Sequence, residues 1–302
     1  MQPFTFYLDW VITGQFAGLC WAQEKGLYAQ AGLAVELRPW QDGRSIVDKV
    51  LAGGLCAGSS EDNLIVSGIA AGRPIKALAG MLQQSPLVLM TKQSSGLRTL
   101  ADLVGRRVAM HADGIRILEA VLALDGIDRA TIDLTEVTYD LDNLATDRFD
   151  AVQGYAMSEP LELAALGFAI ELIPVRHYHL HPYAQIFFAS EEVIQQKAAI
   201  LRAFLAASFE GWRQAMAQRE AAAQVVVKLA QGMADLTTER QIVDTLATYV
   251  SGEIALERFG LLDLGRWQRN LDTYAKLGLT PRRLTVAEVM DAQFLQAIYG
   301  CD

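Results

Sequence analysis

Residues 4–40, FTFYLDWVITGQFAGLCWAQEKGLYAQAGLAVELRPW, contain one complete strand–helix–strand unit. The apolar residues at 4–10 predict a strand, and residues 16–32 predict a helix that ends at Gly32, because glycine commonly terminates helices. Residues 33–40 predict the second strand. Two strands joined by a helix usually pair in parallel, so this stretch predicts a mostly parallel sheet covered by helices.

The same alternation continues towards the C-terminus. It runs to about residue 90 and starts again, as a second series with its own apolar segments, between residues 107 and 174. We therefore predict an α/β fold with two lobes, formed by residues 1–90 plus 186–302 and by residues 91–185. The chain would cross between the lobes near residues 89–92 and 183–187. A ligand cleft is expected between the lobes, since open α/β sheets bind ligands at the carboxyl ends of their strands.

The chain from Glu191 onward is predicted to be nearly all helical, forming a helical C-terminal tail. Phe204, Phe209 and Trp212 recur at helical spacing in this region. An aromatic stripe of this kind is typical of a helix that faces the core.

Bulk composition excludes several classes of protein. Of the 302 residues, 52% are hydrophobic, the net charge is −9 and the pI is about 5.0. Such a chain is globular, and its acidity argues against nucleic acid or an anionic membrane as a partner. It has no apolar run of 18 residues that would span a membrane. The sequence starts with a strand pattern instead of a leader, so we expect a cytosolic protein or a secreted one whose leader is absent from this chain.

No metal or cofactor site is predicted. Cys20, Cys56 and Cys301 lack the spacing of a metal site. His177, His179 and His181 alternate in RHYHLHPY, but no acidic or thiol ligand lies near them in sequence. We interpret this segment as a loop that lines a pocket.

Candidate ligand-binding residues follow from the predicted strand ends, supplemented by the polar and aromatic residues near the second crossing. The set is rich in aromatic, amide and carboxylate groups and contains no arginine or lysine, which favours a flat heteroaromatic ligand over a sulfonate or phosphate. Its members are Asp9, Trp10, Gln15, Trp40, Ser59, Ser60, Glu61, Met81, Gln83, Asp113, Tyr155, Glu159, Tyr178 and Tyr183.

Two parts of this set have alternative interpretations. Tyr155 and Glu159 are four residues apart, so on one helix face the tyrosine would stack on a ring while the glutamate accepts N–H bonds from an aminopyrimidine edge. Alternatively, Glu159 only favours a helix N-terminus through the helix dipole. Ser59 and Ser60 precede a predicted helix, where they would contact a ligand, cap the helix, or do both.

Several segments resemble the periplasmic substrate-binding proteins related to the thiamine pyrimidine-precursor binding proteins, a group with riboflavin- and alkanesulfonate-binding members. The segments are LDW….GQFAGLCWAQEKGLYAQAGLAVEL, GSSEDNLIVSGIAAGRPIKALAGMLQQSPLVLM, SGLRTLADLVGRRVAM, FDAVQGYAMSEPLELAALG, LRAFLAASFEGWRQAM and GRWQRNLDTYAKLGL. The resemblance spans nearly the whole chain, through the order and spacing of motifs that are individually weak.

The resemblance implies a type II periplasmic-binding-protein-like fold whose lobes close on a small heteroaromatic ligand. It further implies a periplasmic monomer that delivers a thiamine pyrimidine precursor to the membrane subunits of an ABC transporter. Tyr155 and Glu159 match the Y-x-x-x-E-P position that contacts the aminopyrimidine in the pyrimidine-binding members, which raises the weight of the ligand interpretation.

Two alternatives come from other functional classes. Pyrimidine synthases in the same family consume pyridoxal phosphate and a histidine of their own chain. Here the first strand–helix turn, VITGQFAG, has no histidine, and Lys49 is a candidate for holding the cofactor only by its place in a predicted helix. The second alternative is a ligand-sensing input domain of a signalling protein.

Overall fold

The computed structural model describes residues 1–302 except 42, 178, 252–253 and 301–302. The chain forms two compact units. Unit 1 consists of Met1–Gln84, Tyr183–Gln268 and Leu284–Asp302, and unit 2 of Ser85–Pro182 and Arg269–Arg283. The sequence-based prediction places all of 186–302 in the first lobe, whereas Arg269–Arg283 belongs to unit 2. One reason is that Asn270 bonds the backbone of His181 through both groups of its side-chain amide.

Unit 1 is built on a five-stranded sheet in the order β2-β1-β3-β10-β4. β1 pairs in parallel with β2 and β3, and β10 runs antiparallel to β3 and β4. The strands are β1 Gln2–Tyr7, β2 Leu33–Arg38, β3 Cys56–Ser60, β4 Ile75–Leu82 and β10 Ala184–Ser190.

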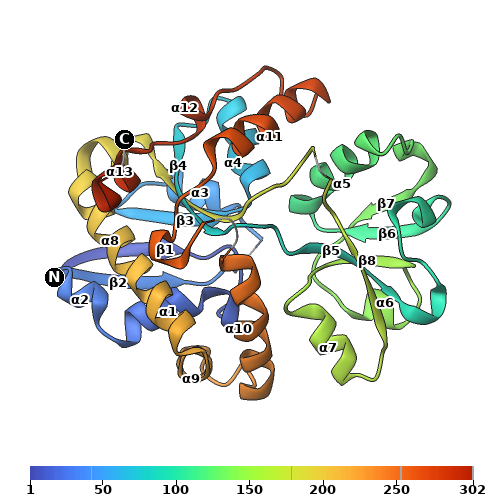
Figure 1. The fold of residues 1–302 in the computed structure, drawn as a ribbon, viewed down its shortest axis with the longest axis horizontal. Helices are drawn as coiled ribbons and strands as arrows, with labels where there is room; N and C mark the ends of the chain where they lie inside the picture. The colour runs from blue at the N-terminus through green and yellow to red at the C-terminus, as the bar shows by residue number, and fades with distance from the viewer. Residues whose placement is uncertain (42, 178, 252–253, 301–302) are drawn as a thin grey trace. The chain divides into compact units, whose positions relative to one another are not determined.

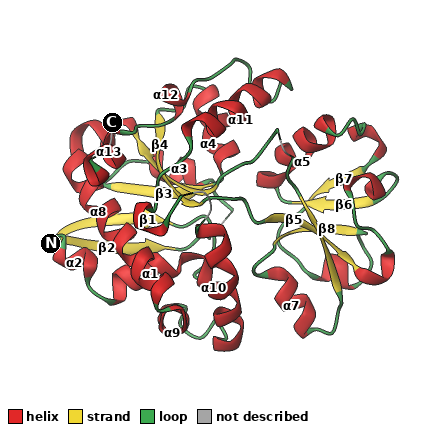
Figure 2. Ribbon diagram, in the orientation of Figure 1, coloured by secondary structure: helices red, strands yellow, loops and turns green. Residues whose placement is uncertain are grey.

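Helices flank the sheet of unit 1 (Figure 2). The single helix expected at 16–32 is divided, since Gly26 has φ of 69° and ends α1 before α2 begins. The helices are η1 Gly14–Phe16, α1 Ala17–Glu24, α2 Leu27–Gln30, α3 Ile46–Leu51, α4 Asp62–Ala70, α8 Glu191–Ala217, α9 Arg219–Leu229, α10 Leu236–Val250, η5 Leu256–Arg258, α12 Val286–Val289 and α13 Gln293–Tyr299. A further helix, α11 Leu264–Lys276, begins in unit 1 and continues into unit 2.

The core of unit 1 is aromatic, as the helical stripe predicted. Phe204, Phe209 and Trp212 of α8 are fully buried. The ring of Phe204 stacks on Phe4 of β1 with centroids 4.6 Å apart. α1 crosses α8 at glycine, because a Cβ on Gly18 would lie 2.2 Å from the Trp212 side chain.

Unit 2 has its own five-stranded sheet, in the order β7-β6-β8-β5-β9. β6 is parallel to β7 and β8, while β5 is antiparallel to β8 and β9. Its elements are β5 Leu87–Lys92, η2 Gln93–Ser95, η3 Leu100–Leu103, β6 Arg107–Met110, α5 Ala112–Leu124, η4 Arg129–Thr131, β7 Asp133–Glu136, α6 Asp142–Ala145, β8 Ala151–Tyr155, α7 Glu159–Ala165 and β9 Ile170–Pro174.

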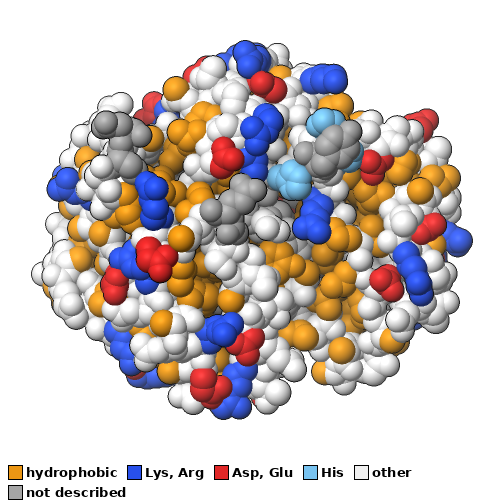
Figure 3. Space-filling model, in the orientation of Figure 1, with side chains coloured by type: hydrophobic (Ala, Val, Ile, Leu, Met, Phe, Trp, Pro, Cys, Tyr) orange, Lys and Arg blue, Asp and Glu red, His pale blue; other side chains and the backbone are white. Residues whose placement is uncertain are grey.

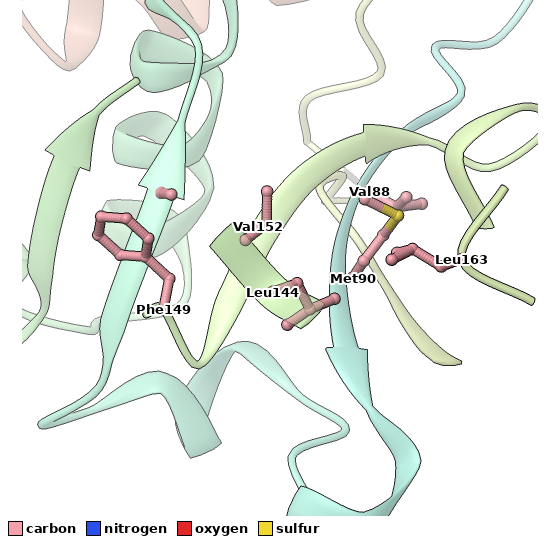
Figure 4. Packing of buried hydrophobic residues seen from close by; sticks show 7 residues of the cluster. Val88, Met90, Leu144, Phe149, Val152 and Leu163 are labelled. Atoms are coloured by element: carbon pink, nitrogen blue, oxygen red, sulfur yellow. The ribbon is translucent and has the colours of Figure 1, made fainter. Parts of the chain in front are cut away.

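Unit 2 also has its own buried apolar cluster. Figure 4 shows Met90 of β5 and Val152 of β8 packed with Leu144, Phe149 and Leu163. Two mixed sheets, each with its own core and helices, confirm the predicted α/β class.

The surface carries charges of both signs. On the face drawn in Figure 3, Lys and Arg side chains are interspersed with Asp and Glu. In the part of the chain that the structure describes, no helix combines the length and the hydropathy needed to cross a membrane.

Candidate functional site

Asp9 and Ser59 meet at the carboxyl edge of the unit 1 sheet. β1 and β3 are neighbouring parallel strands, so the residues that end them lie side by side. The Ser59 hydroxyl donates to Asp9 Oδ1 at 2.6 Å and accepts from the Asp9 backbone N–H at 3.1 Å. The serine therefore fixes the position of the aspartate carboxylate at this edge.

Trp10 and Trp40 form an aromatic pair at the same edge. β1 and β2 pair in parallel up to Tyr7 and Arg38. The segments that follow these two strands stay side by side. The backbone N–H of Trp40 donates to the Trp10 carbonyl at 3.0 Å. The two rings stack with centroids 5.7 Å apart and planes 18° apart, and both are half-buried. The sequence predicted both residues without indicating that they touch.

Neither predicted serine caps α4. Both belong to β3, and the N-cap of α4 is Glu61, whose side chain makes no capping bond. The capping interpretation is therefore wrong, because the strand continues through both serines and the helix starts later. Ser59 instead hydrogen-bonds Asp9.

Met81, Gln83 and Gln15 are buried within unit 1. Met81 is fully buried in β4. Gln83 holds neighbouring chain segments together, since its side-chain Nε2 donates to the Leu261 carbonyl at 2.8 Å and its backbone N–H to Tyr249 at 2.7 Å. Gln15 lies in η1, directly after the loop that carries Trp10.

Glu239 of α10 is a residue that the sequence analysis missed. It is 3% exposed, and its carboxylate accepts the backbone N–H of Gly14, at the start of η1. It thereby anchors the segment that follows β1. No sequence signal connects two residues 225 positions apart, so only the structure identifies this contact.

Tyr183 is a structural residue of unit 1. Its ring is fully buried, and its hydroxyl both donates to the Asp263 carbonyl and accepts from the Asp263 N–H. The Arg266 guanidinium lies 3.7 Å from the ring centroid. Burial raises the pKa of Tyr183 to about 12, so the hydroxyl stays neutral. The other predicted tyrosine of this segment, Tyr178, lies outside the described residues.

In unit 2, the predicted residue Asp113 meets two further polar residues, His111 and Gln153, where β6 and β8 lie side by side. Gln153 of β8 accepts from the His111 N–H at 3.0 Å and donates to Asp113 Oδ1 at 3.2 Å. A Cβ on Gly114 would lie 2.2 Å from Gln153 Oε1, so glycine permits this approach. Burial lowers the pKa of His111, which favours the neutral imidazole. A polar residue inside the apolar segment FDAVQGY was the available signal for Gln153.

Glu159 and Tyr155 are in contact, but not across a helix face. Tyr155 ends β8 and Glu159 begins α7, so the expectation of one helix face is wrong. The Glu159 carboxylate, 7% exposed, accepts the Tyr155 backbone N–H at 2.9 Å and the Ser158 hydroxyl. Burial raises its pKa despite these bonds. The carboxylate therefore holds the strand-to-helix turn closed.

A further residue that the sequence analysis missed, Tyr139, lies beside these groups. Its hydroxyl donates to Glu162 Oε2 at 2.8 Å, and its ring centroid is 6.3 Å from that of His111. Unit 2 thus gathers aromatic, imidazole and carboxylate groups around the ends of β6 and β8.

The histidine-rich segment makes local contacts. His177 Nε2 lies 3.3 Å from Asp125 Oδ1, and the His177 and His179 rings are 5.3 Å apart. Over the described residues, no group of three or more His, Cys, Asp and Glu side chains is arranged to hold a metal ion.

Most of these groups lie in a part of the chain that matches a known sequence family, whereas Asp9, Trp10 and Glu239 lie outside the match. Residues 13–222 match the family model described as NMT1/THI5 like. The chain belongs to the NMT1/THI5-like family. The match covers Gln15, Trp40, Ser59, Asp113 and Glu159 among the predicted site residues, and it confirms the resemblance drawn from the sequence.

Individual relatives differ in what their names describe. The riboflavin-binding protein RibY of Chloroflexus aurantiacus is 22% identical over 98% of this chain and 86% of its own. A 4-amino-5-hydroxymethyl-2-methylpyrimidine phosphate synthase of Legionella pneumophila is 23% identical over 68% of this chain and 67% of its own. The periplasmic aliphatic sulphonate binding protein SsuA of Escherichia coli has a similar structure, with a TM-score of 0.72, 16% identity and full coverage of both chains. The chain therefore has the periplasmic-binding-protein fold.

Proposed function

We propose that this protein binds a small heteroaromatic molecule, specifically a thiamine pyrimidine precursor, and delivers it to the membrane subunits of an ABC importer. The observation that carries the proposal is the stacked pair Trp10–Trp40 beside the fixed carboxylate of Asp9. Half-buried indole faces suit a flat ring, and a carboxylate suits a ligand with N–H donors.

The charge of these residues argues against a sulfonate ligand. The predicted site residues of unit 1 include the carboxyl group of Asp9, and those of unit 2 include the carboxyl groups of Asp113 and Glu159. Neither set contains arginine or lysine. An anionic ligand is held by guanidinium groups, ammonium groups or several amides, and nearby carboxylates would repel it. Although SsuA shares the fold, these carboxyl groups favour a ligand that donates hydrogen bonds.

The proposed transport role also leads to a proposed cellular location and oligomeric state. Substrate-binding proteins of ABC importers act in the periplasm, and we propose that location here, with the protein acting as a monomer. Binding would be stoichiometric and would leave the ligand chemically unchanged.

A pyrimidine synthase is the alternative, since the Legionella relative carries that name. In this chain, the Lys49 ammonium lies in the last turn of α3 and donates to the Gln41 carbonyl at 3.1 Å. Formation of a pyrimidine product after addition of pyridoxal phosphate would favour the synthase over the binding protein.

A thermal-shift screen tests the proposal. The panel would contain 4-amino-5-hydroxymethyl-2-methylpyrimidine, thiamine, riboflavin, pyridoxal phosphate, taurine and an aliphatic sulfonate. A ligand at a hundred times its Kd adds about 2.7 kcal/mol of stability. We expect the aminopyrimidine to raise Tm. A shift with sulfonates alone would contradict the heteroaromatic proposal.

A further inference from the structure

Gln185 combines two unfavourable features at one position. It is the second residue of β10 and has φ of 53°, in the left-handed region that non-glycine residues avoid. Its side chain is buried, with the residue 1% exposed, and its Oε1 atom has no hydrogen-bond partner among the described residues. A strained backbone and an unsatisfied buried acceptor both destabilise a folded protein.

The other described non-glycine residues with positive φ differ from Gln185. Asp147 and Gln231 are both exposed, and neither lies in a strand. Their carboxylate and amide groups can be solvated by water, whereas Gln185 Oε1 is closed off from bulk solvent. Gln185 is thus the member of this group that calls for a functional explanation.

Gln185 lies at the carboxyl edge of the unit 1 sheet. Its neighbours pair with the last residues of the adjacent strands, Ala184 with Leu82 of β4 and Ile186 with Ser60 of β3. Among the residues that the structure describes, Gln185 itself has no partner in either ladder. β3 also carries Ser59, which holds the Asp9 carboxylate, so the strands that carry Gln185 and Ser59 are neighbours in the sheet.

We propose that Gln185 is a ligand-specificity residue whose Oε1 accepts a hydrogen bond from a ring N–H or an exocyclic amine of the bound heterocycle. This inference rests on the proposed function and names the donor that its ligand must carry. Asp9 and Gln185 together offer oxygen acceptors at one sheet edge. A ligand that supplies an N–H donor satisfies the buried oxygen, and a ring without that donor leaves it unsatisfied.

Matched ligands and variants test the proposal by titration calorimetry. Riboflavin, which has an imide N–H, is compared with 3-methylriboflavin, and an aminopyrimidine is compared with its dimethylamino analogue. Gln185→Met keeps the unbranched shape and removes the oxygen, and Gln231→Met is the control at an exposed position with the same sign of φ. We expect Gln185→Met to weaken binding of the N–H-bearing ligand at least tenfold and binding of its methylated partner less than twofold. Gln231→Met should change neither.

Other outcomes overturn the proposal or separate it from the function itself. If Gln185→Met loses the same affinity for both ligands of a pair, or for neither, Gln185 does not accept a hydrogen bond from the N–H group, and the proposal is overturned. If wild-type protein binds neither ring family, the proposed function fails, and ligand-free melting then decides on Gln185 alone. Because methionine keeps the volume of the buried side chain and removes the unsatisfied oxygen, Gln185→Met should melt no lower than wild type, as should Gln231→Met. A lower Tm in Gln185→Met alone would show that the amide stabilises the ligand-free fold and would overturn the proposal.

Discussion

The Glu159 carboxylate accepts the backbone N–H of Tyr155, at 2.9 Å, where β8 turns into α7. The contact places a nearly buried acid on a structural hydrogen bond within residues 155–160, which read Y-x-x-x-E-P. Its first role is therefore to shape the turn. Contact with a ligand would be a further use of a carboxyl group whose position is already fixed.

Glu159→Gln should change the pH dependence of stability. Burial raises the pKa of Glu159 above its ordinary value of 4.5, so the folded state binds this proton more tightly than the unfolded state does. The resulting stabilisation is complete below the ordinary value and is lost as pH rises through the raised pKa. The amide keeps an acceptor for the Tyr155 N–H and does not titrate. Urea unfolding of both proteins, from pH 4.5 upward, measures the effect. As pH rises, wild type should lose free energy of unfolding relative to Glu159→Gln, and parallel plots of this free energy against pH would contradict the raised pKa.

Trp10→Ala should weaken ligand binding while leaving the fold intact. Loss of one stacking face costs about 1.4 kcal/mol or more of binding free energy, which corresponds to about tenfold in Kd. Trp10→Phe should recover part of the loss because it restores a flat ring. Tryptophan fluorescence titrations measure both effects, with Trp267→Phe, a change at a fully buried ring, as the control for general destabilisation. Equal affinity in wild type and Trp10→Ala would remove the aromatic pair from the site.

Glu239→Ala should destabilise the segment after β1. The substitution leaves the Gly14 N–H without its acceptor in a buried place, at a cost of about 1–3 kcal/mol. Glu239→Gln keeps an acceptor and should lose less. Chemical unfolding gives the two differences in stability, and a loss in Glu239→Gln as large as in Glu239→Ala would show that charge matters here instead of the hydrogen bond.

Gly18→Ala should be among the most damaging single substitutions. The added methyl group would lie 2.2 Å from Trp212 and 2.7 Å from its backbone, so α1 and α8 must separate. Overpacking of this kind costs about 1–3 kcal/mol or more. Gly68→Ala is the matched control, because its nearest neighbour is the flexible end of Ile75 at 3.3 Å. Melting temperatures that fall equally in both variants would contradict the close-crossing account.

Local sequence patterns predicted the α/β class, the two series of strands and the aromatic face of α8. They did so because strand and helix periodicities, glycine stops and apolar runs act over a few residues. The periodicity of residues 16–32 did not reveal that Gly26 adopts a left-handed backbone and divides the helix. The two polar features that the sequence could not supply, Glu239 on Gly14 and the orphaned oxygen of Gln185, arise from segments that meet only after folding.

The candidate site was predicted in part for the same reason. Trp10, Trp40, Asp9 and Ser59 follow from the rule that parallel strands end at one edge, and the structure brings these four together in two contacts. The sequence did not indicate that the Tyr183 ring is buried, because distant segments complete the core around it.

The most direct test is a calorimetric titration of the purified protein with 4-amino-5-hydroxymethyl-2-methylpyrimidine, riboflavin and taurine. We predict saturable one-to-one binding of a heteroaromatic ring, preferentially the aminopyrimidine, with the ligand recovered unchanged and no heat from taurine. Saturable binding of taurine, with no binding of either ring compound, would contradict the account.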